Sequence, residues 1–449
     1  MLTLGVQCSA SSVMSSSMMT DSAAWREFLV FFVHRHFNFR YPELDAVLTL
    51  QGLRLVDVVG TSDITTLPDP ESSPLLRIRL PSEAHAKFLS RWRNRKCVAS
   101  ISEMYCRSRA PVKTPDEKFL VLEEFGLELP DLKTAKPRRL FFLREIAGSE
   151  RNRGRGGARD LIDQQTLKKR AYIGPTSMES EMALLMCNMG LVQRGDLVID
   201  PFVGTGSVLV PCATHGAVCF GTDIDIRVLL GIGVGVSGAG ADQAEQEDAS
   251  ARVNVISNFK QYGLPLPELI RADNSMSPLV KRCSGYFDAV VCDPPYGIRA
   301  GARKSGRKPG AQVLTSEQLA EKAKKQKYIP PTQPYAAEDV MKDLLEFAAQ
   351  TLREGGRLVY LLPTTYEYTD DDLPRHPLLR VIANSEQKLT KKYARRLITM
   401  IKLSEPQVSA QTTEASATST GDDLSYANLR EKILAENRKR RKLGDGLGN

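Results

Sequence analysis

The amino-acid sequence predicts an α/β protein: a mostly parallel sheet with helices on both faces, preceded by a separate α+β region. Two observations predict this architecture. From about residue 173 onward, apolar strand-like runs alternate with helical stretches, and alternating β and α units form parallel sheets. Before residue 149, strand-like and helical runs are mixed without that alternation. At 449 residues the chain is long enough for two or three domains.

The composition excludes several classes of protein. Apolar residues make up 42% and charged residues 25%, which are ordinary values for a globular chain. No apolar run reaches the roughly 18 residues that a membrane-spanning helix needs, so we expect no membrane partner. The eight cysteines include no C-x-x-C pair, which argues against a disulfide scaffold and a metal site and favours a reducing compartment. The N-terminus is a poor secretory signal and a poor transit peptide, so we expect a cytoplasmic protein.

The net charge of +8 is concentrated in two segments. Residues 299–327 carry nine basic and two acidic side chains, and residues 425–449 carry seven and three. Such segments fit either a solvated surface or a polyanionic partner such as RNA. The second segment includes five consecutive basic residues from Arg438 to Lys442. This run also fits a nuclear localisation signal, which would give a nuclear pool.

The N-terminal region divides into an extension, a folded part and a linker. Residues 1–22 are rich in Ser and Met and are predicted to be disordered. Residues 149–172 are rich in Arg, Lys and Gly and predict a linker to the next domain. The elements expected between them are a strand from Trp25, a helix entered through Pro42, a strand and a helix over 75–92, and strands or mixed runs that begin at residues 96, 118 and 138.

The second region contains the predicted parallel sheet. Its helix at 340–352 has apolar residues at helical spacing and is expected to end at Gly355 and Gly356. Insertions at 233–251 and 299–334 interrupt the domain, and a low-complexity segment follows residue 404. The expected strands are residues 197–200, 218–223, 269–273, 287–293, 357–363, 378–383 and 396–403.

A glycine-rich turn follows the first of these strands. In Asp200-Pro-Phe-Val-Gly-Thr-Gly-Ser207, Gly204 and Gly206 allow a tight turn and a close approach to a ligand, and the next helix supplies unpaired N–H groups. The third glycine of the dinucleotide fingerprint is missing, which counts against NAD. Asp200 with the Pro-Phe that follows it points instead to S-adenosylmethionine. A purely structural tight turn is the alternative.

Acidic residues end the next two strands. Asp223 can accept hydrogen bonds from both hydroxyls of a ribose, whereas Asp225 fits a helix cap. Asp273 can accept a hydrogen bond from an adenine amino group, or it can cap the helix that follows.

Two further segments give weaker signals. Thr176 and Ser177, in the run GPTSM, either cap a helix or line the methionine end of the cofactor. Arg395 and Arg396 precede an apolar run, where they fit a solvated strand edge or a phosphate contact.

The strand at 287–293 ends in the most specific motif, Asp293-Pro294-Pro295-Tyr296. Two prolines make a rigid loop at the carboxyl end of a strand, where open α/β sheets bind ligands. An exocyclic base amine is a poor nucleophile because its lone pair is delocalised into the ring. The Asp293 carboxylate and the Pro294 carbonyl can accept its N–H groups and aim the lone pair at a methyl group, and Asp293 can take the proton. Tyr296 offers a face on which an extruded base can stack.

These motifs occur together in one family. GPTSM, DPFVGTGS, GTDID, FDAVVCDPPYGIR, GGRLVYLLP and RRLITM follow one another in the order seen in it. From about Trp25 to Ser404 the sequence resembles the catalytic subunit of eukaryotic tRNA (guanine(10)-N2)-methyltransferases. DPPY alone also occurs in DNA adenine and release-factor methyltransferases, whereas DPPYGIR together with RRLITM is much narrower.

The resemblance implies a fold and a division of the chain. The fold is a Rossmann-like S-adenosylmethionine-dependent methyltransferase sheet with an antiparallel last strand, preceded by an α+β region that contains a THUMP-type RNA-binding domain. The implied parts are an N-terminal extension at 1–22, a THUMP-like tRNA-binding region at 23–160, a methyltransferase domain at 161–404 with its two insertions, and a basic tail at 405–449.

The resemblance also implies roles for the motif residues. Thr176, Asp200, Gly204 and Gly206 would contact S-adenosylmethionine. Asp223 would bind the cofactor's ribose and Asp273 its adenine. The run from Asp293 to Tyr296 would hold the guanine amine.

The implied reaction is methyl transfer from S-adenosylmethionine to the exocyclic N2 of a guanosine in tRNA, at position 10. Direct in-line displacement would need positioning and electrostatics but no metal. A small zinc-binding activator subunit is the implied protein partner. Two alternatives stay open: an amino-methyltransferase that acts on adenine or cytosine of RNA or DNA, and a catalytically inactive RNA-binding scaffold.

Overall fold

The computed structural model describes the protein between Trp25 and Ser404, with gaps. The expected N-terminal extension, the insertion at 233–251, most of the basic segment 299–327 and the tail beyond residue 404 lie outside the described residues. In the described part of the chain, no helix is long and apolar enough to cross a membrane. The described residues are 25–32, 37–61, 66–91, 98–105, 119–124, 139–148, 158–232, 253–280, 284–295, 301–306, 315, 317–318, 321, 331–390 and 393–404.

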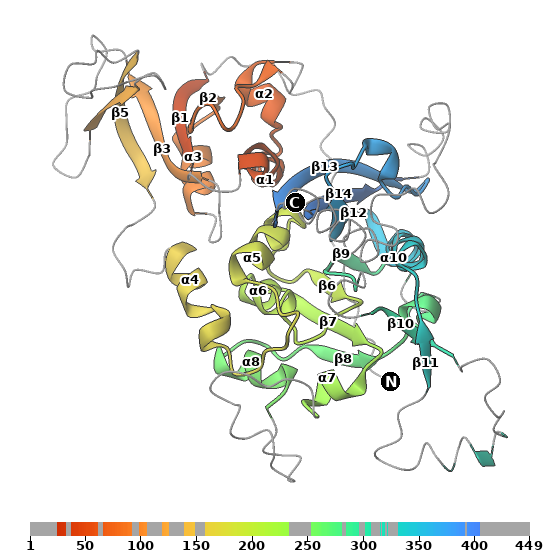
Figure 1. The fold of residues 1–449 in the computed structure, drawn as a ribbon. Coiled ribbons are helices and arrows are strands. Elements are labelled where there is room, and N and C mark those ends of the chain that lie inside the picture. The colour runs from red at the N-terminus through yellow and green to blue at the C-terminus, as the bar shows by residue number, and fades with distance from the viewer. Residues whose placement is uncertain are drawn as a thin grey trace, which may run out of the picture.

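The N-terminal unit is built on an antiparallel sheet with the strand order β2-β1-β3-β5-β4 (Figure 1). Phe28, Val30 and Phe32 alternate along β1 and are buried, because successive side chains of a strand point to opposite faces. The predicted α+β region is confirmed, and its three ambiguous runs are all strands. The elements are β1 (Arg26–Phe32), η1 (Phe37–Phe39), α1 (Arg40–Thr49), α2 (Leu55–Val59), β2 (Leu75–Leu80), α3 (Glu83–Arg91), β3 (Val98–Tyr105), β4 (Phe119–Glu124) and β5 (Arg139–Gly148).

The second unit contains a seven-stranded sheet with the order β13-β14-β12-β9-β6-β7-β8. Only β14 runs antiparallel to the other strands of this sheet. All seven predicted strands are confirmed, and so is the antiparallel last strand. The strands are β6 (Leu197–Asp200), β7 (Val218–Asp223), β8 (Glu268–Arg271), β9 (Phe287–Cys292), β12 (Leu352–Thr365), β13 (Leu379–Lys388) and β14 (Tyr393–Lys402).

The strand order of this sheet reverses between β6 and β9. The chain runs from β6 outward to β7 and β8 on one side, then returns to β9 and continues to β12 on the other. Open α/β sheets bind ligands at the carboxyl ends of the strands on either side of such a switch point. Because β6, β7, β8 and β9 are parallel, the acidic residues that follow them meet at one edge, which we call the carboxyl edge.

Helices and short elements cover the second sheet (Figure 1). The predicted helix at 340–352 is confirmed, but it ends at Thr351 and not at the glycines. Gly355 instead lies inside β12 with a φ of 74°, where the pairing of β12 with β9 shifts register. The elements are α4 (Ala158–Gln164), η4 (Leu167–Lys169), α5 (Ser180–Met189), α6 (Leu209–Thr214), α7 (Ile226–Leu230), α8 (Val255–Gln261), η6 (Asn274–Met276), β10 (Arg303–Ser305), β11 (Thr332–Pro334), α10 (Ala337–Thr351) and η7 (Asp370–Asp372).

The predicted linker at 149–172 is wrong in its second half. Residues 158–164 form α4, and both Arg170 and Tyr172 are fully buried in the second unit. The basic composition suggested exposure, but these two side chains find hydrogen-bond partners inside the fold. We call residues 165–178, which include both, the strap.

The two units contact each other through α1 and α5 (Figure 1). Asn188 Nδ2 donates a 2.7 Å hydrogen bond to Glu43 Oε1, and both residues are only 1% exposed. Beside this contact, η1 lies against β13, where Asn38 Nδ2 donates to the Glu386 carbonyl at 3.5 Å. The N-terminal unit therefore covers part of the sheet edge formed by β13.

Candidate active site

The glycine-rich turn after β6 needs glycine for backbone reasons. Gly204 and Gly206 are both left-handed, with φ angles of 50° and 79°. A Cβ atom on Gly206 would also lie 2.8 Å from Val255 Cγ1 of α8. Both glycines are therefore required by the fold of the turn, and ligand binding by it stays a prediction.

Asp223 fastens the end of β7 to this turn. One carboxylate oxygen accepts a hydrogen bond from the Gly204 amide at 3.0 Å, and the other accepts from the Asp225 amide at 2.9 Å. Burial raises the pKa of Asp223, and the two backbone bonds partly offset the rise. The alternative role for Asp225 is confirmed, because its side chain caps α7 by accepting from the Arg227 amide at 3.0 Å.

Asp200 is the most buried carboxylate at the carboxyl edge, with 2% of its surface exposed. It accepts a 2.9 Å hydrogen bond from the Phe202 amide. Burial, and then the neighbouring charges of Asp293 and Asp223, raise the pKa of Asp200 well above its usual range. The charges of Asp293 and Asp223 thus act on Asp200, and their negative potential favours a ligand that carries positive charge.

Asp273 serves the protein's own backbone. It is the N-cap of η6 and accepts a 2.9 Å hydrogen bond from the Ser275 amide, which confirms the capping alternative. Its other oxygen accepts from the Ser305 amide. Burial raises the pKa of Asp273, but the hydrogen bonds from Ser305 and Ser275 outweigh it and hold that pKa below its usual value.

The contact with Ser305 shows that part of an insertion belongs to the site. Ser305 lies in β10, inside the expected insertion at 299–334, and β10 pairs with β11. This strand could not be predicted from the sequence, because a short polar strand in a basic insertion has no periodic signal. In the role predicted for Asp273, its carboxylate would accept a hydrogen bond from adenine in addition to those from the Ser275 and Ser305 amides.

Asp293 and Pro294 follow β9 directly across the switch point from the glycine-rich turn. The four residues that precede Asp293 are all 0% exposed, so buried packing fixes where the loop starts. Asp293 is partly buried and Pro294 is buried. Pro295 is also described, whereas Tyr296 lies outside the described residues, and its stacking role stays a prediction.

The run GPTSM joins the glycine-rich turn. The Ser177 hydroxyl accepts from the Gly174 amide at 2.8 Å and lies 2.7 Å from the Thr205 hydroxyl. The predicted capping role is wrong, because α5 begins only at Ser180 and its N-cap, Glu179, makes no side-chain cap. Thr176 is exposed beside this junction. The run is therefore placed at the turn, as its predicted cofactor role requires.

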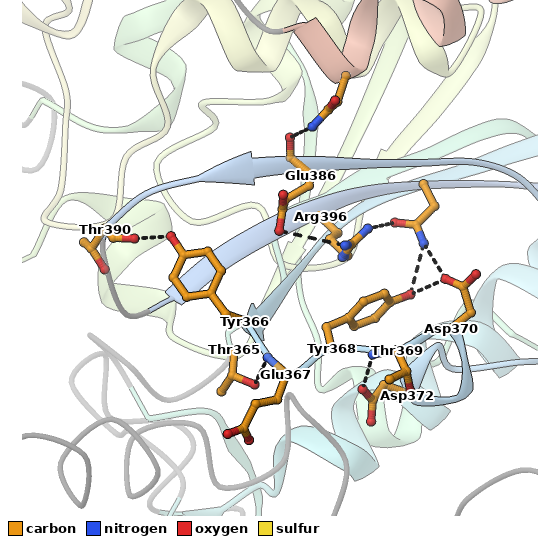
Figure 2. Close-up of polar contacts among 12 residues, drawn as sticks. Thr365, Tyr366, Glu367, Tyr368, Thr369, Asp370, Asp372, Glu386, Thr390 and Arg396 are labelled. Carbon is orange, nitrogen blue, oxygen red and sulfur yellow. Dashed lines mark hydrogen bonds and ion pairs between the residues drawn. The ribbon is translucent and has the colours of Figure 1, made fainter. Parts of the chain in front are cut away.

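A polar cluster surrounds the segment that follows β12 (Figure 2). β12 continues to Thr365, beyond its last pairing with β9 at Tyr360. In the segment that follows, the Tyr368 ring packs 4.0 Å from the Arg396 guanidinium, which also donates to Asn384 at 3.1 Å. The Tyr366 hydroxyl donates to the Thr390 carbonyl between β13 and β14, and Asn384 of β13 donates to the Tyr368 hydroxyl at 3.0 Å.

This cluster corrects one prediction about Arg395 and Arg396. Both lie within β14, which pairs with β13 on one side and β12 on the other, so the prediction of a solvated strand edge is wrong. Arg396 is engaged with protein groups, and Arg395 Nε donates to Gln387 Oε1 at 2.6 Å. The strand was expected to begin at residue 396, but it begins at Tyr393, so both arginines lie inside it.

The sequence is similar to a methyltransferase family and to individual tRNA methyltransferases. A family model described as an RMKL-like methyltransferase domain matches residues 168–316. The chain is 32% identical over 444 residues to the tRNA (guanine(10)-N(2))-methyltransferase TRMT11 of Pongo abelii, with 86% of this chain and 90% of that one covered. It is 43% identical over 292 residues to the enzyme of the same name from Dictyostelium discoideum, with 64% of this chain and 51% of that one covered. Among solved structures it is similar to TrmN from Thermus thermophilus, at 16% identity and a TM-score of 0.35, over 84% of this chain and 100% of that one.

The sheet order and the glycine-rich turn at its switch point define a Rossmann-like methyltransferase. The similarity along nearly the whole length of a curated relative is more specific. The chain belongs to the TRMT11 family of tRNA (guanine(10)-N(2))-methyltransferases.

Proposed function

We propose that this protein transfers a methyl group from S-adenosylmethionine to the exocyclic N2 of the guanosine at position 10 of tRNA. The names of its relatives state guanine(10)-N(2) methylation of tRNA for those enzymes. The observation that carries the proposal for this chain is the placement of Asp293 and Pro294 on the strand next to the glycine-rich turn. A base amine held by Asp293 and Pro294 would face a methyl donor held by the glycine-rich turn.

The residues at the turn fit S-adenosylmethionine. A carboxylate offers about four lone-pair sites, so Asp223 keeps acceptor capacity for ribose hydroxyls after its two backbone bonds. The three carboxylates at the carboxyl edge suit the positive charge of the cofactor. When bound, S-adenosylmethionine supplies an electrophilic methyl group on a sulfonium sulfur.

Groups of the chain itself orient the guanine amine in this proposal. The Asp293 carboxylate accepts one amine hydrogen and the Pro294 carbonyl accepts the other, which turns the nitrogen lone pair toward the methyl group. As the nitrogen–carbon bond forms and the sulfur–carbon bond breaks, positive charge develops on the nitrogen, and the Asp293 carboxylate stabilises it. The amine proton then passes to Asp293 or to water.

The proposal extends to the rest of the chain. Residues 23–160 are proposed as a THUMP-like tRNA-binding region and residues 161–404 as the methyltransferase domain, with 1–22 and 405–449 as extensions. The buried contact between Glu43 and Asn188 supports a tRNA-binding role for the first unit, because it holds that unit against α5 of the methyltransferase domain. A small zinc-binding activator subunit is the proposed protein partner. The proposed location is the cytoplasm, with a nuclear pool through the basic run of the tail.

A methyl-transfer assay tests the proposal. The purified protein, alone and with the activator subunit, receives labelled S-adenosylmethionine and an unmodified tRNA transcript, and the product is digested to nucleosides. N2-methylguanosine that disappears when guanosine 10 is replaced supports the proposal. Methyladenosine or methylcytidine would place the protein among the other amino-methyltransferases. The absence of both product and cofactor binding would leave an RNA-binding scaffold.

A further inference from the structure

The strap is tied to the glycine-rich turn by a chain of hydroxyl groups. Arg170 Nη1 donates a 3.2 Å hydrogen bond to the Ser207 hydroxyl, which lies 3.3 Å from the Thr205 hydroxyl. The Thr205 hydroxyl in turn lies 2.7 Å from the hydroxyl of Ser177. Arg170, inside the strap, and Ser177, near its end, therefore both reach the same turn, which the chain forms about 30 residues later.

Two side-chain amides of α8 hold the strap in place. Asn258 accepts from the Tyr172 amide and donates to the Tyr172 carbonyl, both at 2.8 Å, and it donates to the Thr205 carbonyl at 3.2 Å. Gln261 accepts from the Ala171 amide at 2.8 Å and donates to the Lys169 carbonyl at 2.6 Å. These amides satisfy backbone groups of the strap that no neighbouring strand pairs. Asn258 thus fixes the strap and the turn at once.

Arg170 is an unusual residue for such a position. Its side chain is fully buried, and burial lowers its pKa. Its guanidinium donates to the Ser207 hydroxyl at 3.2 Å and to the Gln165 carbonyl at 3.1 Å, which are both neutral. The side chains of Tyr262 and Glu179 act to raise the pKa of Arg170, but burial outweighs them. Burying this guanidinium therefore costs free energy that its neighbours offset only in part, so an arginine here calls for a role that an apolar side chain cannot fill.

We propose that Arg170 is a positioning residue for the cofactor, because its hydrogen bond to Ser207 holds the turn from Gly204 to Ser207 in its ligand-binding conformation. The inference rests on the proposed function, in which that turn receives S-adenosylmethionine. Glycines at two positions leave the turn many backbone conformations, and ordering it only on binding would weaken affinity. The planar fork of an arginine reaches Ser207 and Gln165 together, which a lysine cannot do.

The test compares Arg170→Met and Ser207→Ala with a matched control. Arg357 is also a buried arginine, 6% exposed, and it donates to a backbone carbonyl, that of Met189, at 2.9 Å. The hydrogen bond from Arg357 goes to Met189 and not to the glycine-rich turn. Arg357→Met therefore removes a buried guanidinium without affecting Ser207. Calorimetry on the full-length protein measures the Kd for S-adenosylmethionine, thermal unfolding measures stability, and steady-state assays separate KM from kcat.

We expect Arg170→Met and Ser207→Ala each to raise the Kd about ten-fold, since each removes a hydrogen bond to a charged group. The double variant should bind no more weakly than Arg170→Met, because both act through one bond. The KM for S-adenosylmethionine should rise with kcat at saturation retained. Arg357→Met should lower the melting temperature and leave the Kd unchanged.

Three results would overturn the inference: an unchanged Kd in Arg170→Met, additive effects in the double variant, or an equal rise of the Kd in Arg357→Met. If Arg170→Met does not fold, Ser207→Ala alone decides, and an unchanged Kd in that folded variant refutes the inference. Wild-type protein that binds no S-adenosylmethionine would refute the proposed function instead.

Discussion

The Gly204 amide donates a 3.0 Å hydrogen bond to the Asp223 carboxylate, across the space between two neighbouring strands. The bond joins the residue predicted to hold the ribose to the turn predicted to approach the rest of the cofactor. A change at the end of β7 is therefore felt in the turn after β6.

Replacing Asp223 with Asn should weaken cofactor binding about ten-fold or more, because one of its two oxygens becomes an amide that cannot accept from a backbone N–H. Calorimetric titration with S-adenosylmethionine measures the loss. Asp225→Asn is the matched control, since Asn caps a helix as well as Asp does. An equal loss of affinity in both variants would contradict a specific role for Asp223.

Replacing Asp293 with Asn should lower kcat by on the order of 10²–10³-fold and leave the Kd for S-adenosylmethionine near its wild-type value. The amide cannot stabilise the charge that develops on the guanine nitrogen. Single-turnover methyl transfer measures the rate. Asp288 lies near the other end of β9 and accepts a 2.7 Å hydrogen bond from the Leu197 amide, so Asp288→Asn should retain kcat. A wild-type rate in Asp293→Asn would remove Asp293 from the mechanism.

Replacing Asp200 with Asn should stabilise the ligand-free protein above neutral pH while it impairs the site. Because burial raises the pKa of Asp200 above the ordinary 3.8, the folded state binds its proton more tightly than the unfolded state. Wild-type stability from this group therefore falls as pH rises from 3.8 through the raised value. We expect a gain on the order of 1 kcal/mol at pH 8 and none below pH 4, in urea unfolding. A variant that is less stable at pH 8 would show that Asp200 is not destabilised in the fold.

The two glycines of the turn should differ in their tolerance of alanine. Gly204→Ala should cost about 1 kcal/mol, because it meets only the strain of a left-handed backbone. Gly206→Ala should cost about 2–3 kcal/mol, since its Cβ would also lie 2.8 Å from Val255 Cγ1. Thermal unfolding measures both values. Adding Val255→Ala should recover part of the loss at Gly206, and no recovery would contradict the steric explanation.

The contact between the two units should be sensitive to loss of one polar partner. Asn188→Leu removes the Nδ2 donor from the buried Glu43 carboxylate and should cost about 2–3 kcal/mol. Changing both Glu43 and Asn188 to leucine should restore part of the stability, because this contact then contains no buried carboxylate. Equilibrium unfolding measures the three variants. If Asn188→Leu costs nothing, the contact does not hold the units together.

The sheet and its acidic edge could be predicted from local signals. The strand that leads to Asp293 is an apolar run buried on both faces, and parallel pairing then brings Asp200, Asp223 and Asp293 to one edge. Each of these steps depends on residues close together in the sequence, or on the rule that βαβ units make parallel sheets. Gly204 and Gly206, which lie two residues apart, likewise indicated a tight turn from the local sequence alone.

Three of the misses involve partners that are far apart in the sequence. Arg170 looked like part of a basic linker because Ser207, its acceptor, comes 37 residues later. Asp273 receives a bond from Ser305 across an insertion without periodicity. Arg396 looked exposed because its aromatic partner Tyr368 comes from a different loop. Composition describes a segment by itself, and it cannot say which cavity of the fold will take an arginine.

The strap has a consequence for how the protein is made. The ribosome releases residues 165–178 first, the glycine-rich turn next, and Asn258 and Gln261 of α8 only after the insertion at 233–251. A nascent chain that has emerged as far as the glycine-rich turn therefore contains the strap and the turn, but not the side-chain amides of α8 that bind them. The strap and the turn can be joined by these amides only once α8 has left the exit tunnel, so this part of the fold is completed late in synthesis.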